Sequence, residues 1–265
     1  MTQAIDAAAR YGAEELDYSI CTLVTRWDEY RAMQDSFRAK GFREPACEFL
    51  YLDNAAGNRF DAYSGLNLFL STARGRVVVL CHQDVRLVDD GRAELDAIIA
   101  AMDRDHPQWG VLGNAGGTPA GTLCIRITDP HGADTRRGAF PAAATALDEN
   151  FLAVRRSANL ALSADVGGYH LYGADLCLMA DLLGHSAHVV DFHLHHLSPG
   201  NADASFAAAR RCIIAKYQRA LAPRWVTTTC TAFVAGGGAL STLAGTRWGA
   251  KLLRSLRKRY RGKRP

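Results

Sequence analysis

Acidic and imidazole side chains suited to metal binding occur at two separate places in the sequence. Asp84 follows the apolar run of residues 77–81, and a histidine cluster near residue 195 consists of His193, His195 and His196. A hard cation that bridges a diphosphate is bound by carboxylate oxygen, sometimes with one imidazole, and keeps positions open for phosphate oxygens. Asp84 and one late histidine would supply such a site. From spacing alone, a turn at Asp84 and ordinary surface histidines are an equally good interpretation.

Three common nucleotide or catalytic motifs are missing from the sequence. GxGxxG does not follow the first apolar run, where TRWDEY stands, and this disfavours a dinucleotide-binding oxidoreductase. The P-loop patterns GxxxxGKS and GxxxxGKT are absent, as is the GxSxG pattern of α/β-hydrolases. The chemistry of the chain therefore rests on its acidic and histidine residues.

The first hundred residues alternate strand and helix signals. Apolar and β-branched runs predict strands at 19–25, 48–52 and 77–81, and helices are expected at 27–40 and 62–72. This spacing predicts right-handed βαβ crossovers and a parallel sheet covered on both faces, an α/β fold. Ligands of such sheets bind beyond the carboxyl ends of the strands. We therefore expect one crevice to be lined by the polar residues that follow the three strands: Thr25 and Arg26, Asp53 and Asn54, and His82, Gln83 and Asp84.

The later part of the chain gives shorter signals. Further strands are expected at 109–112 and 122–128, and helices at 93–102, 175–183 and 202–221. Residues 129–139 are expected to form a loop, and ordered structure returns at 148–157.

Composition and charge indicate an enzyme-sized globular protein. The 265 residues are 48% apolar and 22% charged, close to globular averages. The net charge of +4 hides an asymmetry, because residues 246–265 contain nine Lys or Arg and no acid. The remaining body is mildly acidic, which is not the profile of a nucleic-acid-binding domain, so we expect no nucleic-acid partner.

Cysteine usage and the N-terminus favour a cytoplasmic location. The seven cysteines form no CxxC pair and lie mostly in apolar runs, as reduced buried thiols do. The N-terminus lacks the basic start and apolar run of a signal peptide. The uncharged stretch 226–246 is rich in Thr, Gly and Ala and is too weakly apolar for a membrane span.

A succession of segments resembles the family 2 glycosyltransferases, particularly a bacterial glycosyltransferase-like subgroup. The segments are SICTLVTR, FLYLDNAAGNRFDAYSGLN, ARGRVVVLCHQDV, LDENFLAVRRS, GYHLYGADLCLMADLLG and HHLSPGN, and together they span residues 19–201. The resemblance implies a GT-A fold, Rossmann-like, with a mostly parallel central sheet flanked by helices. It also implies an inverting enzyme that uses a nucleoside-diphosphate sugar with Mg²⁺ or Mn²⁺.

The resemblance assigns donor and metal roles to the strand ends. Asp53 looks like the acid that contacts the nucleobase, with Asn54 beside it, and a turn residue in an Asp-Asn loop is the competing interpretation. The triplet at 82–84 occupies the place of the family's DxD metal motif, and Asp84 matches its last aspartate whereas His82 replaces the first. His196 best matches the late histidine that completes the metal site, with His195 as the rival.

Further residues are assigned to catalysis and to the acceptor. Asp175 matches the family's general base, and Ala174 stands where the preceding glutamate usually is. Asp175 would also serve as a helix cap, and the two roles are compatible. The acceptor or sugar is expected to meet four further residues: Asp148, Glu149, Arg156 and Tyr172. Of the adjacent Arg155 and Arg156, at most one can balance the diphosphate if both lie on a strand.

The chain is expected to consist of a GT-A domain at 1–222 and a helical extension at 223–265. In the basic tail, Trp248, Leu252, Leu256 and Tyr260 recur every four residues among Lys and Arg, an amphipathic helix pattern suited to an anionic membrane surface. A solvated, partly disordered tail is the competing interpretation. The acceptor is expected to be a glycan or a lipid-linked glycan. Two other functions stay open: a non-catalytic sugar-nucleotide-binding domain and a nucleotidyltransferase.

Overall fold

The computed structural model describes residues 16–200 and 204–238, together with residues 241, 242, 246, 248, 249, 251, 252 and 255. The chain divides into two compact units, Met1–Ala209 and Arg210–Pro265. This division falls within a helix, α6 (Ala204–Ala220), so the boundary expected at residue 222 stays a prediction.

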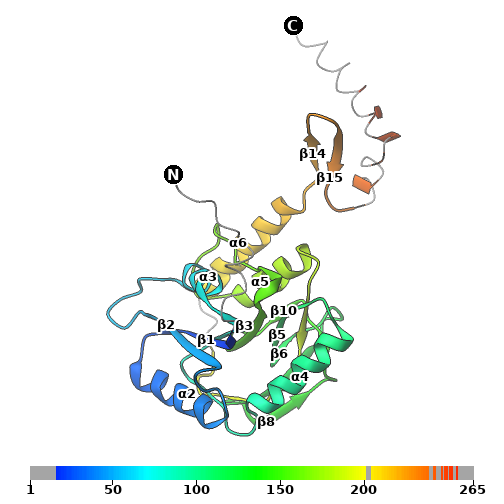
Figure 1. The fold of residues 1–265 in the computed structure, drawn as a ribbon. Helices are drawn as coiled ribbons and strands as arrows, with labels where there is room; N and C mark the ends of the chain where they lie inside the picture. The colour runs from blue at the N-terminus through cyan, green and yellow to red at the C-terminus, as the bar shows by residue number, and fades with distance from the viewer. Residues whose placement is uncertain are drawn as a thin grey trace, which may run out of the picture. The chain divides into compact units, whose positions relative to one another are not determined.

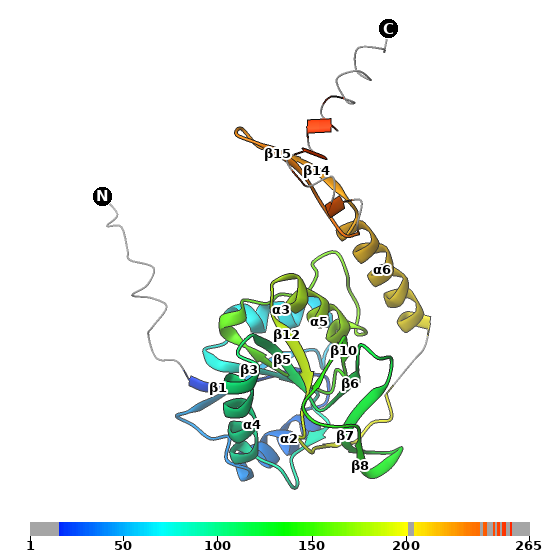
Figure 2. The same ribbon diagram turned by 90° about the vertical axis from the view of Figure 1, so that its right-hand side faces the viewer.

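A seven-stranded sheet forms the centre of the first unit (Figures 1 and 2). Its strands, in spatial order, are β2 (Cys47–Asp53), β1 (Leu16–Val24), β3 (Gly75–Cys81), β11 (Phe151–Arg155), β5 (Trp109–Gly113), β12 (Ser186–Val189) and β9 (Ala142–Ala143). Five of them run in one direction, whereas β11 and β9 run antiparallel to their neighbours. The expected strands at 19–25, 48–52, 77–81 and 109–112 all belong to this sheet.

Helices cover both faces of the sheet. Helices α2 (Trp27–Ala39) and α4 (Arg92–Asp105) lie on one side, and α3 (Ala62–Thr72) and α5 (Tyr172–Leu182) lie on the other (Figures 1 and 2). The central strands are consequently apolar on both faces, as in β3, where residues 77–81 are all buried. The prediction of an α/β fold with a mostly parallel sheet flanked by helices is confirmed.

Local sequence signals explain where the first two helices begin and end. Helix α2 ends before Gly41, which has a φ of +98°, a conformation that glycine adopts at little cost. Helix α3 begins after Asp61, whose carboxylate accepts a hydrogen bond of 2.8 Å from the backbone N–H of Ser64. Both helices therefore match their expected ranges closely.

A second sheet lies beside the first and carries part of the site. Its order is β10 (Ala146–Leu147), β6 (Ala115–Gly117), β7 (Leu123–Asp129), β13 (His195–His196) and β4 (Val85–Arg86), and β8 (Gly132–Arg137) pairs with β7. The expectation of a loop at 129–139 is wrong, because β8 occupies most of it. The sequence of β8, GADTRR, has no apolar face, so its pairing with β7 gives no periodic signal.

The structure after α6 departs from a purely helical extension. Strands β14 (Arg224–Thr227) and β15 (Ala232–Ala235) form an antiparallel hairpin. Most of the basic tail, including Leu256 and Tyr260, lies outside the described residues, and Trp248 and Leu252 are exposed. In the described part of the chain, no helix combines the length and apolar character that a membrane crossing requires.

Candidate functional site

A pocket lies at the carboxyl ends of β1, β2 and β3, and we call it the first pocket. It has a volume of about 260 Å³, and its wall includes five of the residues expected there: Thr25, Asn54, His82, Gln83 and Asp84. These residues lie together because their strands run in parallel, so the polar residues that follow them gather at one edge of the sheet. Their roles in nucleotide binding stay predictions.

Gln83 fixes the shape of one side of the first pocket. Its Oε1 accepts hydrogen bonds of 2.9 Å from the backbone N–H groups of both Thr25 and Arg26. Its Nε2 donates to Thr25 Oγ1 at 2.8 Å. The amide thus ties the end of β1 to the end of β3, and we assign Gln83 a positioning role.

Asn54 and Asp53, at the end of β2, differ in their relation to the pocket. The buried Asn54 side chain donates to the carbonyl of Phe60 at 2.8 Å and accepts from its N–H at 3.2 Å, so it holds the following loop. Asp53 accepts from the N–H of Ala55 at 2.9 Å, which is a local turn. Asp53 is not part of the wall of the first pocket.

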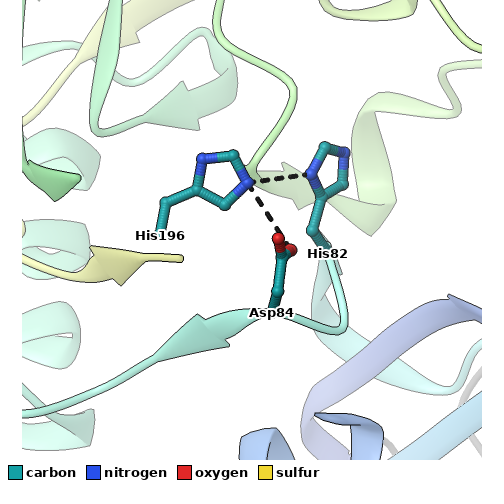
Figure 3. A group of neighbouring side chains, drawn as sticks. All are labelled: His82, Asp84 and His196. Atoms are coloured by element: carbon teal, nitrogen blue, oxygen red, sulfur yellow. Dashed lines mark hydrogen bonds and ion pairs between the residues drawn. The ribbon is translucent and has the colours of Figure 1, made fainter. Parts of the chain in front are cut away.

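Two imidazoles and one carboxylate meet beside this pocket and form what we call the His82 cluster: His82, Asp84 and His196 (Figure 3). Nε2 of His196 lies 3.3 Å from Nδ1 of His82 and 3.5 Å from Oδ1 of Asp84. Ligand atoms bound to one ion at about 2.1 Å are separated by roughly 3.0–3.5 Å. The donor set and its spacing therefore fit a divalent metal, and two imidazole ligands favour a transition metal over Mg²⁺.

Backbone pairing brings the distant parts of the His82 cluster together. Strand β13 pairs antiparallel with β4, so that His196 lies opposite Val85 and His195 opposite Arg86. Adjacent residues of a strand point to opposite faces, and only His196 therefore faces Asp84. His195, the rival metal ligand, faces away.

Asp84 and His196 each stabilise the charged form of the other. Burial opposes ionisation of Asp84, but its hydrogen bond to His196 and the positive charge of that ring hold the pKa of Asp84 well below its usual value. Burial likewise disfavours the charged form of His196, yet Asp84 raises the pKa of this imidazole above its ordinary value. A carboxylate that stays ionised at neutral pH is ready to bind a cation.

Tyr172 determines which nitrogen of His82 carries the proton. The Tyr172 hydroxyl donates its proton to the carbonyl of Glu149 at 3.0 Å, and the same oxygen lies 2.8 Å from Nε2 of His82. Because that hydroxyl proton is already used, Nε2 of His82 must be the donor. Nδ1 then carries the lone pair toward His196 and Asp84, as a metal ligand requires.

A second pocket, of about 630 Å³, adjoins the first. Both pockets include His82, Tyr169 and Ser198 in their walls, and the second also contains Asp148, Glu149 and His196. The His82 cluster therefore lies where the two pockets meet. This arrangement offers room for two ligands, one on each side of a bound metal.

Glu149 has an unusual environment in the second pocket. Burial raises the pKa of this carboxyl to about 8, even though Oε1 accepts a hydrogen bond of 3.2 Å from the N–H of Gly173 at the start of α5. At Gly173 a side chain would be 2.2 Å from the carbonyl oxygen of Leu147, so glycine lets α5 begin this close to Glu149. Proton transfer near neutral pH suits such a carboxyl.

Asp175 and Arg156 lie elsewhere. Asp175 is fully buried in the first turns of α5, and its two carboxylate oxygens accept from Ser163, at 2.7 Å from the N–H and 2.6 Å from the hydroxyl. It belongs to the wall of neither pocket. Arg156 lines a separate pocket near α3. None of the residues in the wall of that pocket belongs to the wall of the first or the second pocket.

Sequence reasoning missed some members of the site. His82 was expected only to contact the donor, but its position two residues before Asp84 was a usable signal, because imidazole can replace a carboxylate as a metal ligand. Tyr169 and Ser198 line both pockets, and no sequence pattern singled them out.

The protein called ATP synthase subunits region ORF 6, from Fuscovulum blasticum, is 39% identical to this chain over 230 residues. The match covers 84% of the chain and 92% of that protein. The chain belongs to the family of this ORF 6 protein. The name of the ORF 6 family states no activity, and no protein-family model matches the chain.

Two solved structures show a partial likeness to this member of the ORF 6 family. S. aureus TarS has a TM-score of 0.49 and 12% identity, with 78% of this chain and 44% of TarS covered. A197 from STIV has a TM-score of 0.39 and 10% identity, with 68% of this chain and 85% of A197 covered. Neither likeness is close enough to assign an activity, so membership of the family 2 glycosyltransferases stays a prediction.

Proposed function

We propose that this protein is an inverting, metal-dependent glycosyltransferase with a GT-A fold. It transfers a sugar from a nucleoside diphosphate to a hydroxyl of a glycan or a lipid-linked acceptor. One observation carries the proposal: the His82 cluster lies where two pockets meet, at the carboxyl ends of parallel strands. The sequence resemblance to family 2 glycosyltransferases supports the same function.

The two pockets are assigned to the two substrates. The nucleotide of the donor binds in the first pocket, between Thr25 and Asn54, and its diphosphate lies toward Asp84. The acceptor enters the second pocket, where Asp148 and Glu149 face it. A divalent metal held by His82, Asp84 and His196 would neutralise negative charge on the diphosphate leaving group.

Glu149 is the proposed general base. An acceptor hydroxyl is a weak nucleophile until a base removes its proton, and a base works best when its pKa lies near the working pH. Burial gives Glu149 a pKa of about 8, whereas Asp175 is enclosed by Ser163 and exposes no oxygen to either pocket. The sequence resemblance assigned this role to Asp175, and variants of Glu149 and Asp175 separate the two assignments.

A donor-hydrolysis assay tests the proposal. The protein, treated with EDTA, is incubated with a panel of nucleoside-diphosphate sugars with and without Mn²⁺, and released nucleoside diphosphate is measured. Metal-dependent release from at least one donor is expected. Binding without release would point to a sugar-nucleotide-binding domain, and release of pyrophosphate from nucleoside triphosphates would point to a nucleotidyltransferase. Either outcome contradicts the proposal.

The cytoplasmic location and an attraction of the basic tail to anionic membranes are proposed with it. The nine basic residues at 246–265 support this attraction, which is electrostatic and should weaken as salt concentration rises.

A further inference from the structure

A second group of metal-ligating side chains lies outside both pockets, and we call it the His193 cluster: Asp89, His193 and His195. Nδ1 of His193 lies 2.8 Å from Oδ2 of Asp89, and Nε2 of His195 lies 3.8 Å from the same oxygen. One ligand atom from each of the three residues lies within 4.8 Å of the other two. Two imidazoles thus converge on one carboxylate, whereas a simple ion pair needs only one.

The extended chain before β13 explains why the protein has two such clusters. His193 and His195 both face Asp89, whereas His196 faces Asp84. The His193 cluster therefore shares no ligand with the His82 cluster, although both use neighbouring residues of the same segment.

The surroundings of His193 are those of a metal ligand. Its side chain is only 4% exposed, and Nε2 lies 2.9 Å from Oγ1 of Thr128. Nδ1 of His193 is at hydrogen-bond distance from Asp89 and donates its proton to that carboxylate, and a bound ion would replace this proton while Nε2–H donates to the Thr128 hydroxyl oxygen. Histidines that bind metals nearly always have such an outer partner on the second ring nitrogen.

The backbone carbonyl of Asp89 is held by a hydrogen bond, and its carboxylate is accessible to solvent. Its carbonyl accepts a hydrogen bond of 2.8 Å from Nζ of Lys40, and the neighbouring Asp90 accepts one of 2.6 Å from the backbone N–H of His193. The side chain of Asp89 is 60% exposed and that of His195 is 30% exposed. An ion can therefore enter from solvent and keep a water ligand.

We propose that Asp89, His193 and His195 bind a zinc ion. Two imidazole nitrogens, one carboxylate oxygen and a water complete the tetrahedral coordination that zinc prefers. The ion would link the segment after β4 to the segment before β13, and Thr128 extends this link to β7. This inference is independent of the proposed transferase activity.

Zinc counting in purified protein tests the proposal. Protein treated with EDTA is dialysed against Zn²⁺, and bound zinc per chain is measured for the parent, His195→Ala, His196→Ala and the double variant. We expect two ions in the parent, one in each single variant and none in the double variant. His185→Ala, which changes a histidine outside both clusters, is the matched control and should keep two.

Two further measurements use the His196→Ala background, in which only the His193 cluster remains. Zn²⁺ should raise the melting temperature of His196→Ala but not that of the double variant. Adding Thr128→Val should weaken zinc affinity about 10- to 100-fold, because the outer partner of His193 is lost. The inference is overturned if His196→Ala binds no zinc or if His195→Ala binds as much as the parent. A zinc count that falls in His195→Ala but not in His196→Ala would contradict only the metal role of the His82 cluster.

Discussion

The hydroxyl oxygen of Tyr172 lies 2.8 Å from Nε2 of His82. Since the hydroxyl proton is donated to the carbonyl of Glu149, this contact sets the tautomer in which His82 can bind a metal. Tyr172 was expected from the sequence to contact the acceptor or the sugar. The contact gives it a positioning role in the His82 cluster as well.

Tyr172→Phe should weaken metal binding at the His82 cluster. Loss of an outer hydrogen-bond partner typically lowers metal affinity about 10- to 100-fold, and we expect a change of this size in calorimetric titration with Mn²⁺. Tyr63→Phe is the matched control, because it removes another buried hydroxyl, one that donates to the carbonyl of His170 at 3.0 Å. Equal Mn²⁺ affinity in the two variants would show that Tyr172 does not set the tautomer of His82.

Glu149 should make the folded protein less stable as pH rises. Its folded pKa of about 8 lies above the value of about 4.3 for an unfolded glutamate, so between these values the folded state binds the extra proton. The free energy of unfolding should then fall with rising pH, with a contribution of up to about 1.4 kcal/mol per pH unit.

Glu149→Gln removes this titration and should flatten the pH dependence. Urea unfolding of both proteins at pH 5, 6, 7 and 8 in EDTA measures the difference between their slopes. Parallel slopes for parent and variant would mean that Glu149 keeps an ordinary pKa.

Activity and stability should separate Glu149 from Asp175. Glu149→Gln should keep donor binding and slow sugar transfer at least about 100-fold, the lower end for loss of a general base. In Asp175→Asn the amide oxygen can still accept from the N–H of Ser163 and the amide N–H can donate to its hydroxyl oxygen, so the variant should lose only about 1 kcal/mol of stability while the folded fraction stays active. Urea unfolding and transfer rates per folded molecule give both quantities. Fast transfer by Glu149→Gln together with slow transfer by well-folded Asp175→Asn would reverse the assignment.

The fold was largely predictable from the sequence because its strands carry strong apolar runs. Residues 77–81 are buried on both faces, and helix 62–72 begins after a capping Asp61, so pattern and structure agree. Strand β8 could not be predicted in the same way, since its residues are polar and its order comes from pairing with β7. The hairpin of β14 and β15 is likewise set by pairing between short strands.

Part of the candidate site was predicted from the sequence. Asp84 was predicted because it follows β3, and His196 because it matches a late histidine of family 2 glycosyltransferases; the structure places both in the His82 cluster. The separation of His195 from His196 depends on the register of β13 against β4, and short-range patterns do not contain that register. Asp175 was assigned a role from its match to a motif, but the motif does not show that its carboxylate is buried against Ser163.

Calorimetric titration with nucleoside diphosphate, with and without Mn²⁺, tests the central claim most directly. The parent should bind nucleoside diphosphate more tightly with Mn²⁺, and Asp84→Asn should abolish this gain. Asp89→Asn, the matched change in the His193 cluster, should keep it, and His196→Ala should reduce it more than His195→Ala does. If Asp84→Asn retains the parent's Mn²⁺-dependent affinity, the His82 cluster does not hold the metal that binds the donor.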